Sequence, residues 1–453
     1  MRSTHISGKE PDYANYHITL YKTIDPFGLL PQNMGMIKVD QLGNFELDVV
    51  LTQTTYIYAD FDRWHTSTIL EPGGNYTLQL PPHKPLAEAE KRSPFFSKSD
   101  IPLGLKELPI DDINRQIQAF EIAFAKTEDK YFEDLFVHKS KAALQALKSE
   151  ILQEFPAPSY TFFGQYIYYR LASVEYKLRM TDDSEFIQTY MNVESLPFNN
   201  PPFNKLYKEV FTNYFYKETV LNNNKELKRQ ILSGKLSNIE DYLYHCNNWG
   251  DNLRRITILD AINDSFYLNL YHKDLLLNLL KQVEQSRWTS ELKKLAHKLY
   301  LKLTFLAVGS EAPNLVLKSY DNVKLNLADT FSKEKLNFLH FSNTNNPISR
   351  SNLEQIAQQY DKYKEMVEFI IVMPASCKTK INATTLASWK GKFFFADDNE
   401  LAKYDIKSFP YSFIINKDGK LLISPALNPL DGMTEQLNKT IFNWKREEMN
   451  KTQ

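Results

Sequence analysis

The sequence predicts a multidomain α+β protein with an N-terminal antiparallel β-sandwich, a central all-α region and a C-terminal α/β region. Apolar and polar residues alternate with period two across residues 1–81, whereas a period of three to four dominates residues 105–307. Within residues 308–453, a strand-like apolar run at Phe338, Leu339 and Phe341 leads through a polar turn into a helix pattern at Leu353, Ile356 and Tyr360. A length of 453 residues is what about three domains of roughly 150 residues each require.

Strand and turn patterns fill residues 1–81, the expected β-sandwich domain. Phe45, Leu47 and Val49 alternate with polar neighbours, so each strand is expected to bury one face and expose the other. The run Pro72-Gly73-Gly74-Asn75 marks a turn between strands. A group of aromatic residues is predicted to pack in the core, with a ligand platform as the alternative: Tyr56, Tyr58, Phe61 and Trp64.

A proline-rich linker is expected at residues 82–104. Pro82, Pro85, Pro94 and Pro102 fix extended backbone and interrupt helices. We therefore expect no regular secondary structure between the sandwich and the first helix.

Helical patterns fill residues 105–307. Leu144, Leu147 and Ile151 fall on one face, and Asp111-Asp112 stands where acidic residues favour the start of a helix. The pattern at 292–306 runs into Val308 with almost no linker, and short connections restrict relative motion. We therefore expect the helical region and the C-terminal domain to pack as one unit.

Composition and charge exclude several classes of protein. A formal net charge of -1 argues against a nucleic acid or an anionic membrane held by bulk charge. No apolar run is long enough for a transmembrane helix, and the first residues lack the apolar core of a signal peptide. The chain is therefore expected to start at a mature or trimmed end. Two distant cysteines, Cys246 and Cys377, allow neither a disulfide framework nor a cysteine-rich metal site, and no cofactor is expected.

The C-terminal region contains an apolar strand pattern, a polar turn and a helix pattern between Asn337 and Asn352, reading NFLHFSNTNNPISRSN. The stretch from Phe341 to Arg350 resembles the F-W-A-x-W-C-x-x-C-R motif of the TlpA and AhpC/TSA (redoxin) family of thioredoxin-fold proteins. Phe341, Thr344, Pro347 and Arg350 match this pattern. The two cysteine positions read Asn346 and Ser349, so the chain resembles this family without its Cys-x-x-Cys pair.

Further motifs in family order extend the resemblance over residues 308–453. The entry segment reads VGSEAPNL from Val308, and the first hairpin is matched at residues 321–327. Phe409-Pro410 resembles the dipeptide that carries the family's cis-proline, and residues 413–420 resemble the hairpin that follows it. The resemblance implies a thioredoxin-like fold and a cis Phe409-Pro410 bond facing the turn at Asn346.

The N-terminal region resembles a β-rich module that precedes such domains in TlpA-like proteins of the bacterial cell envelope. Matching features include Ile6-Ser7-Gly8, Val39-Asp40 and Glu71-Pro72-Gly73. This resemblance implies a periplasmic or outer-membrane-associated protein and leaves a lipid anchor open.

The leading hypothesis is a pseudo-oxidoreductase that keeps the fold for binding a protein or peptide of the cell envelope. Disulfide chemistry needs a thiolate that attacks and a second thiol that resolves the mixed disulfide. Asn346 cannot attack, and Ser349 has no base to activate it, so no catalytic residue is expected. Binding residues are expected at the helix start and the proline loop: Asn345, Asn346, Pro347, Ser349, Phe409 and Pro410.

Two alternatives remain open. The first is a thiol-disulfide oxidoreductase that acts through Cys377, which would have to be exposed and near the Asn346 turn. The second is glycan or ligand binding by the β-sandwich.

Overall fold

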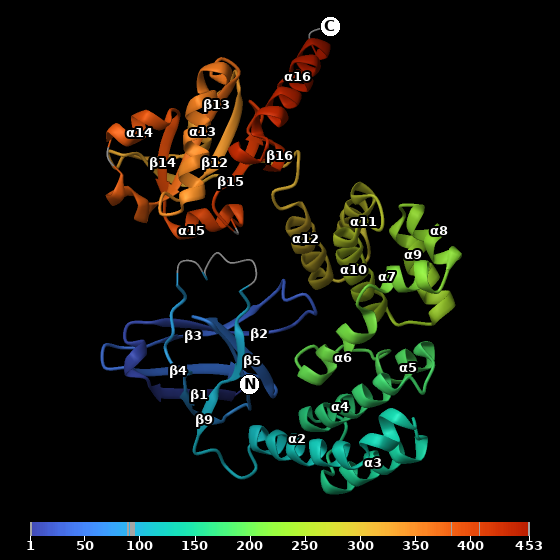
Figure 1. Cartoon of the computed structure of the whole chain (residues 1–453). Helices are drawn as coiled ribbons and strands as arrows, with labels where there is room; N and C mark the ends of the chain where they lie inside the picture. The colour runs from blue at the N-terminus through green and yellow to red at the C-terminus, as the bar shows by residue number, and fades with distance from the viewer. Residues whose placement is uncertain (1, 88–89, 91–95, 382, 407, 452–453) are drawn as a thin grey trace. The chain divides into compact units, whose positions relative to one another are not determined.

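The computed structural model describes residues 2–87, 90, 96–381, 383–406 and 408–451. Its contacts divide the chain into two compact units, the first comprising Met1–Leu86 and Ser97–Leu303 and the second the rest. Within the described residues, the first unit contains two β-sheets and a series of helices. The second contains one larger sheet with helices on its faces (Figure 1).

Two sheets enclose one hydrophobic core in the first unit, with strand orders β4-β1-β7-β9 and β3-β2-β5-β6-β8. Neighbouring strands are antiparallel, as predicted, except for the parallel pairs β1–β7 and β6–β8. Inward-facing side chains such as Ile6, Val49 and Ile57 from both sheets form the core. The strands are β1 (Arg2–Lys9), β2 (His17–Lys22), β3 (Gln32–Lys38), β4 (Asn44–Leu51), β5 (Thr55–Phe61), β6 (Trp64–Leu70), β7 (Asn75–Gln79), β8 (Ser99–Pro102) and β9 (Gly104–Lys106).

The expectation of an irregular linker at 82–104 is wrong in its last part, because β8 and the start of β9 fall there. Pro102 is tolerated because β8 is an edge strand and Pro102 is its last residue, where a missing N–H matters least. Pro94 lies outside the described residues. Trp64 and Phe61 are buried in the sandwich core, so they form no ligand platform.

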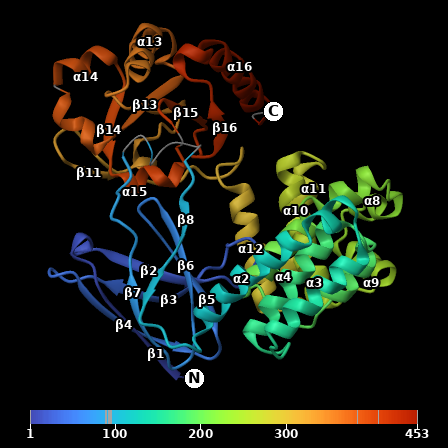
Figure 2. The ribbon, with the colours of Figure 1, turned by 60° about the horizontal axis from the view of Figure 1, so that its bottom comes forward.

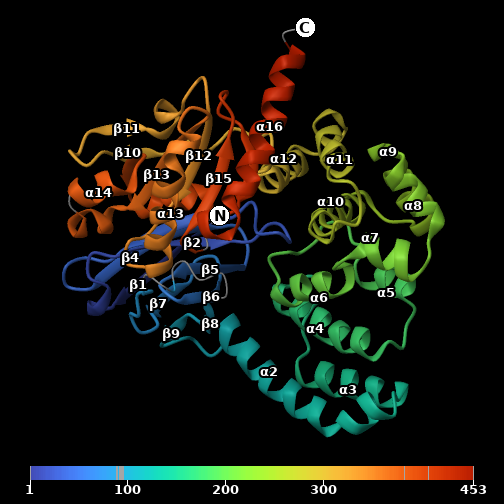
Figure 3. The same cartoon turned by 45° about the horizontal axis from the view of Figure 1, so that its top comes forward.

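The helices α2 to α12 come after the two sheets in the chain, and successive helices lie next to one another (Figure 3). The start of α2 is capped at the acidic pair that the sequence suggested: Asp112 accepts a hydrogen bond from the Asn114 N–H at 2.8 Å. Leu144, Leu147 and Ile151 are all buried, which confirms the predicted apolar face of α3. The helices are α2 (Ile113–Lys130), α3 (Lys141–Glu154), α4 (Phe162–Leu178), α5 (Asp183–Tyr190), α6 (Pro201–Phe211), α7 (Tyr214–Tyr216), α8 (Lys225–Leu232), α9 (Leu236–Asn247), α10 (Asp251–Leu268), α11 (Lys273–Gln285) and α12 (Ser290–Thr304), with π-helical turns η2 (Glu133–Val137) and η3 (Lys217–Leu221).

The helical region belongs to the same compact unit as the sandwich, so the prediction that it packs as one unit with the C-terminal domain is wrong. Specific bonds join it to the sheets. The Asn199 side chain accepts from the Tyr56 N–H at 3.0 Å and donates to the Thr54 carbonyl at 3.0 Å. The Asn114 side chain donates to the Ile69 carbonyl at 2.8 Å. The short connection before Val308 restricts relative motion, but it does not provide packing contacts of the kind that join the helices to the sheets.

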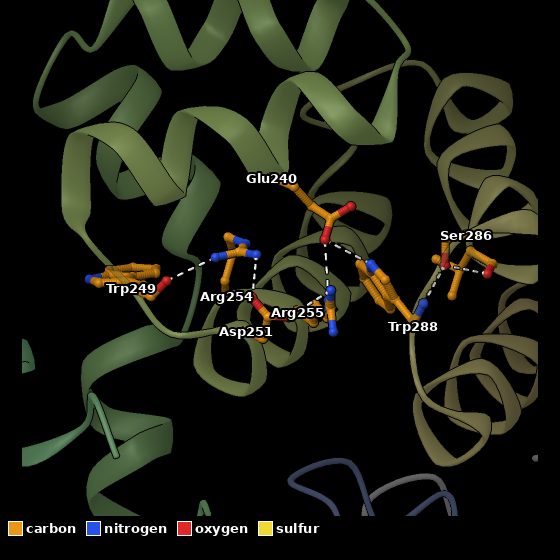
Figure 4. Close-up of polar contacts among 8 residues, drawn as sticks. Glu240, Trp249, Asp251, Arg254, Arg255, Ser286 and Trp288 are labelled. Carbon is orange, nitrogen blue, oxygen red and sulfur yellow. Dashed lines mark hydrogen bonds and ion pairs between the residues drawn. The ribbon is translucent and has the colours of Figure 1, made fainter. Parts of the chain in front are cut away.

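A polar network joins α9, α10 and the segment before α12 (Figure 4). The Glu240 carboxylate accepts from the Trp288 indole N–H at 2.8 Å and from Arg255 Nε at 3.2 Å. Arg255 also pairs with Asp251 at 2.8 Å, and the buried Arg254 donates to the Trp249 carbonyl at 2.9 Å. Because these groups come from separate helices, the network fixes the helices against one another.

The second unit is built on a sheet with strand order β11-β10-β14-β13-β12-β15-β16. The strands β12, β13 and β14 are parallel, whereas β15 is antiparallel to β12. All six residues of β12 are buried, because helices cover both faces of this central strand. The strands are β10 (Val316–Lys318), β11 (Lys324–Asn326), β12 (Leu336–Phe341), β13 (Val367–Pro374), β14 (Lys392–Ala396), β15 (Tyr411–Ile415) and β16 (Leu421–Ala426).

Two hydrophobic clusters lie on opposite faces of this sheet. One packs α13 (Pro347–Tyr363), α14 (Ala383–Trp389) and α16 (Met433–Lys451) against it, and the other includes α15 (Asp398–Leu401). Figure 2 shows α13, α14 and α16 on one side of the strands and α15 on the other. This mixed α/β arrangement places the start of α13 directly after the end of β12.

Candidate functional site

The turn between β12 and α13 is held by its own asparagines. The Asn346 N–H donates to the Asn343 carbonyl at 2.8 Å, and the Asn345 N–H donates to Asn343 Oδ1 at 3.0 Å. Asn346 has extended backbone angles and is the N-cap of α13, where its Oδ1 accepts from the Ile348 N–H at 2.9 Å. Pro347 occupies the first helical position, where its missing N–H would have had no partner in the helix.

The other end of the Asn346 amide reaches a second loop. Its Nδ2 donates to the Phe409 carbonyl at 3.1 Å. The Phe409-Pro410 bond is cis, as the resemblance implied, and the Ser424-Pro425 bond is also cis. One side chain thus joins the start of α13 to the proline loop across 63 residues of sequence.

This bond occupies the backbone carbonyl of Phe409, one of the expected binding residues. Its carbonyl already accepts from Asn346, so an incoming peptide N–H would have to use the second lone pair or displace the amide. Phe409 and Pro410 are both half-buried. Part of the hydrogen-bonding capacity of the proline loop is therefore already used within the protein.

Ser349, at the second cysteine position, is fully buried. Among the described residues its hydroxyl has no hydrogen-bond partner, so no base activates it there. Neither family cysteine position therefore carries a nucleophile ready to attack a disulfide.

Exposed groups around the helix start are mainly uncharged. Asn345, Pro347 and Ile348 are exposed, and Ile348 retains 61% of its surface. Ile348 was not among the binding residues predicted from the sequence, although its position between the two cysteine positions of the motif could have indicated it. Asn352 donates to the Ile348 carbonyl at 2.8 Å and accepts from the Leu430 N–H at 3.0 Å.

Because Asn352 bonds to both backbones, it brings the loop at Leu430 to the first turn of α13. Leu430 is 53% exposed. Ile348 and Leu430 are therefore two exposed apolar residues whose backbones are joined through Asn352.

Cys377 lies in a 3-10 turn after β13 (η5, Ala375–Lys380) and is completely buried. Its thiol donates to Asn343 Oδ1 at 3.3 Å, in the turn that leads to Asn346. The thiol is therefore close to the degenerate motif, as the redox alternative requires, but it is not exposed. Cys246, at the end of α9 in the other unit, is exposed.

A buried histidine lies on the central strand next to this region, and sequence reasoning missed it. His340 Nδ1 is 2.9 Å from Ser412 Oγ, and that hydroxyl lies 2.9 Å from Asn428 Oδ1. Since Ser412 has a single proton to donate and Asn428 Oδ1 can only accept it, Nδ1 must be the protonated nitrogen of His340. Burial lowers the pKa of His340 to about 3, so the ring is neutral at physiological pH.

Within the part of the chain that the structure describes, no group of three His, Cys, Asp or Glu side chains is arranged to hold a metal ion. In the same residues, no helix is long and apolar enough to cross a membrane.

Comparisons with known proteins give consistent relatives. No protein-family model matches the chain. Thiol-disulfide oxidoreductase ResA of Bacillus thuringiensis (strain Al Hakam) is 32% identical over 121 residues, which cover 26% of this chain and 68% of that protein. ResA of Bacillus subtilis (strain 168) is 29% identical over 121 residues, covering 26% and 66%. Among solved structures, a thioredoxin-like protein from Bacteroides caccae is 12% identical with a TM-score of 0.32, covering 58% of this chain and 94% of that one.

Proposed function

The chain belongs to the thioredoxin-fold family of ResA- and TlpA-like thiol-disulfide oxidoreductases, and we propose that it is a non-catalytic member that binds a protein or peptide. The observation that carries the proposal is the role of Asn346. The first cysteine position holds an amide whose two ends cap α13 and bond the proline loop. A position that supplies the attacking thiolate in a thiol oxidoreductase serves here as a structural tie.

The proposed binding surface is the exposed start of α13 with the adjoining loops. Asn345, Pro347 and Ile348 present uncharged groups there, and Phe409 and Pro410 are partly accessible beside them. An exposed apolar side chain beside unreactive polar groups suits a polypeptide partner, which supplies both apolar side chains and backbone hydrogen bonds. Ser349 is buried and contributes to shape alone.

The first experiment measures reductase activity. Insulin reduction by dithiothreitol is expected to run at the uncatalysed rate with the wild-type chain, because both family positions lack sulfur. The double variant Asn346→Cys with Ser349→Cys is the positive control. A disulfide tolerates α-carbon separations of about 4.4–6.8 Å, a range that residues three apart at the start of a helix can meet. Acceleration by the wild type would refute the proposal.

The second experiment measures binding with an unfolded, carboxymethylated, fluorescently labelled polypeptide as the probe. Ile348→Asp is expected to weaken its binding about tenfold, the loss that corresponds to roughly 1.4 kcal/mol of apolar burial. Val323→Asp is the matched control, because Val323 is 62% exposed against 61% for Ile348 and lies in another part of the same sheet unit. Equal losses in the two variants, or no binding by the wild type, would contradict the proposed surface.

A second candidate function is thiol chemistry at Cys377, which its hydrogen bond to Asn343 favours. This candidate requires local opening, because the thiol is buried. Reaction with a thiol reagent distinguishes the two. Under the binding proposal Cys246 reacts at once and Cys377 only on unfolding, whereas rapid labelling of Cys377 and loss of activity in Cys377→Ser would favour redox chemistry.

We also propose that the protein is located outside the cytoplasm, in the periplasm or at the outer membrane. Its support is the envelope-type resemblance of the N-terminal sheets and of the thioredoxin-like unit. Fractionation of cells that produce the full-length protein tests this, and recovery with cytoplasmic markers would contradict it.

A further inference from the structure

The first unit contains a cleft of about 1240 Å³ that the proposed function does not use. Its lining comes from the end of β2, the β4–β5 turn, the turn after β6, α2, the α3–α4 connection with the start of α4, and the segment before α6. Pockets that bind drug-sized ligands have volumes of about 300–1,000 Å³. This cleft is therefore large enough for an oligomeric ligand.

Aromatic rings provide the apolar part of the lining. Phe155, Phe162 and Phe163 are half-buried there, and Tyr160 is 84% exposed. Within the described residues, Tyr160 makes no hydrogen bond or ring contact. Such rings offer contact area at low entropic cost, which is how aromatic residues contribute to binding surfaces.

Several neutral polar groups of the lining are already hydrogen-bonded within the protein. Both ends of the Asn199 amide are bonded to the β4–β5 turn and β5. The Gln116 amide donates to the Asp111 carbonyl at 2.6 Å, and the Thr161 hydroxyl donates to the Pro158 carbonyl at 2.7 Å. These groups are therefore committed to the fold and are poorly placed to recognise a ligand.

Three charged side chains of the lining lack an ion pair within the described residues, alongside several neutral side chains that form no hydrogen bond there. In the described part of the chain, Lys22, Arg115 and Glu154 form no ion pair, and the half-buried Gln165 side chain forms no hydrogen bond. Asn200 is 1% exposed, and its Oδ1 has no partner there while its Nδ2 donates to the Phe162 carbonyl at 3.2 Å. A buried acceptor without a partner is costly, and a ligand N–H would satisfy it.

We propose that this cleft binds a short peptide that carries both acidic and basic groups. Aromatic surface matches apolar side chains, while Lys22 and Arg115 match carboxylates and Glu154 matches an ammonium or guanidinium group. A peptide N–H supplies the donor that Asn200 lacks. A neutral glycan is the less suitable occupant, because it would leave both cations and the carboxylate without counter-charges.

The test uses the full-length protein and an array of eight-residue peptides of varied charge, with a glycan array in parallel. Peptides that carry both charges are expected to bind best. Ala119→Trp, which fills the cleft from an exposed position on α2, is expected to abolish binding. Ala142→Trp is the matched control, because Ala142 is an exposed alanine on α3 outside the lining.

Charge reversal tests the recognition directly. Arg115→Glu is expected to weaken binding of acidic peptides by up to about fivefold, the largest change that the loss of one exposed ion pair produces. Arg287→Glu is the control, since Arg287 is also exposed and without an ion pair in the described residues but lies outside the cleft. Binding to glycans alone, binding to neither array, or equal effects of the two reversals would overturn the proposal.

Discussion

Replacing Asn346 by alanine removes two hydrogen bonds from one position. Loss of an asparagine N-cap costs about 1 kcal/mol, and loss of a bond to a half-buried carbonyl costs about 0.5–1.5 kcal/mol. The bonds at issue are those to the Ile348 N–H and the Phe409 carbonyl. The free energy of unfolding of the second unit is therefore expected to fall by about 2 kcal/mol in Asn346→Ala.

Hydrogen exchange measured by mass spectrometry isolates this unit within the full chain, because amides of β12 and central α13 report its opening. Asn346→Asp keeps the capping acceptor and loses the donor, so its loss of protection is expected to lie between wild type and Asn346→Ala. Asn399→Ala is the control, since Asn399 is exposed and its side chain has no partner in the described residues. Protection in Asn346→Ala equal to that of the control would refute the structural role of Asn346.

Three further predictions concern buried polar groups. The pKa of His340 is lowered by burial to about 3 from 6.5, so the unfolded state takes up the proton first. The contribution of neutral His340 to the free energy of unfolding is expected to be complete above pH 6.5 and to fall by up to about 1.4 kcal/mol per pH unit below pH 6.5. In urea unfolding, the midpoints of His340→Leu should lack this dependence on pH. An unchanged dependence in the variant would contradict the prediction. Burial and the Asp264 carboxylate raise the pKa of Asp260 to about 7 from 3.8, so the folded state holds its proton longer and stability falls as pH rises towards 7. Asp260→Asn is expected to raise the melting temperature more at pH 8 than at pH 4; equal shifts would argue against a titrating Asp260. Glu240→Ala breaks the bonds to Arg255 and the Trp288 indole and is expected to cost about 2–3 kcal/mol in urea unfolding of the first unit; a loss below about 0.5 kcal/mol would mean that water replaces the carboxylate.

The sequence was most informative where neighbouring residues determine structure. The periodicity at Leu144, Leu147 and Ile151 identified a buried helix face, since apolar spacing and burial are set by the same helical turn. The ordered motifs from Val308 onward predicted a strand, a turn and a helix at Asn346, together with the cis bond at Pro410.

What the sequence did not reveal depends on partners distant along the chain. The bond from Asn346 to Phe409 spans 63 residues, and the cleft draws on segments from Lys22 to Asn200. Strand β8 was hidden because its Pro102 is a poor strand residue, yet an edge position next to β6 accepts it. No local pattern records which sheet edge is available to a given segment.

The place of β1 in its sheet has a consequence for synthesis on the ribosome. This strand is central: it pairs on one side with β4 and on the other, in parallel, with β7, which residues 75–79 supply. The outer strand β9 comes later still, at Gly104–Lys106. Strand β1 therefore keeps one unpaired edge until β7 has been made, and its sheet stays incomplete until β9 follows, with synthesis at roughly 5–20 residues per second. Such a nascent chain exposes an unpaired strand edge for several seconds, which is the interval in which a ribosome-associated chaperone would have most effect on the yield of folded protein.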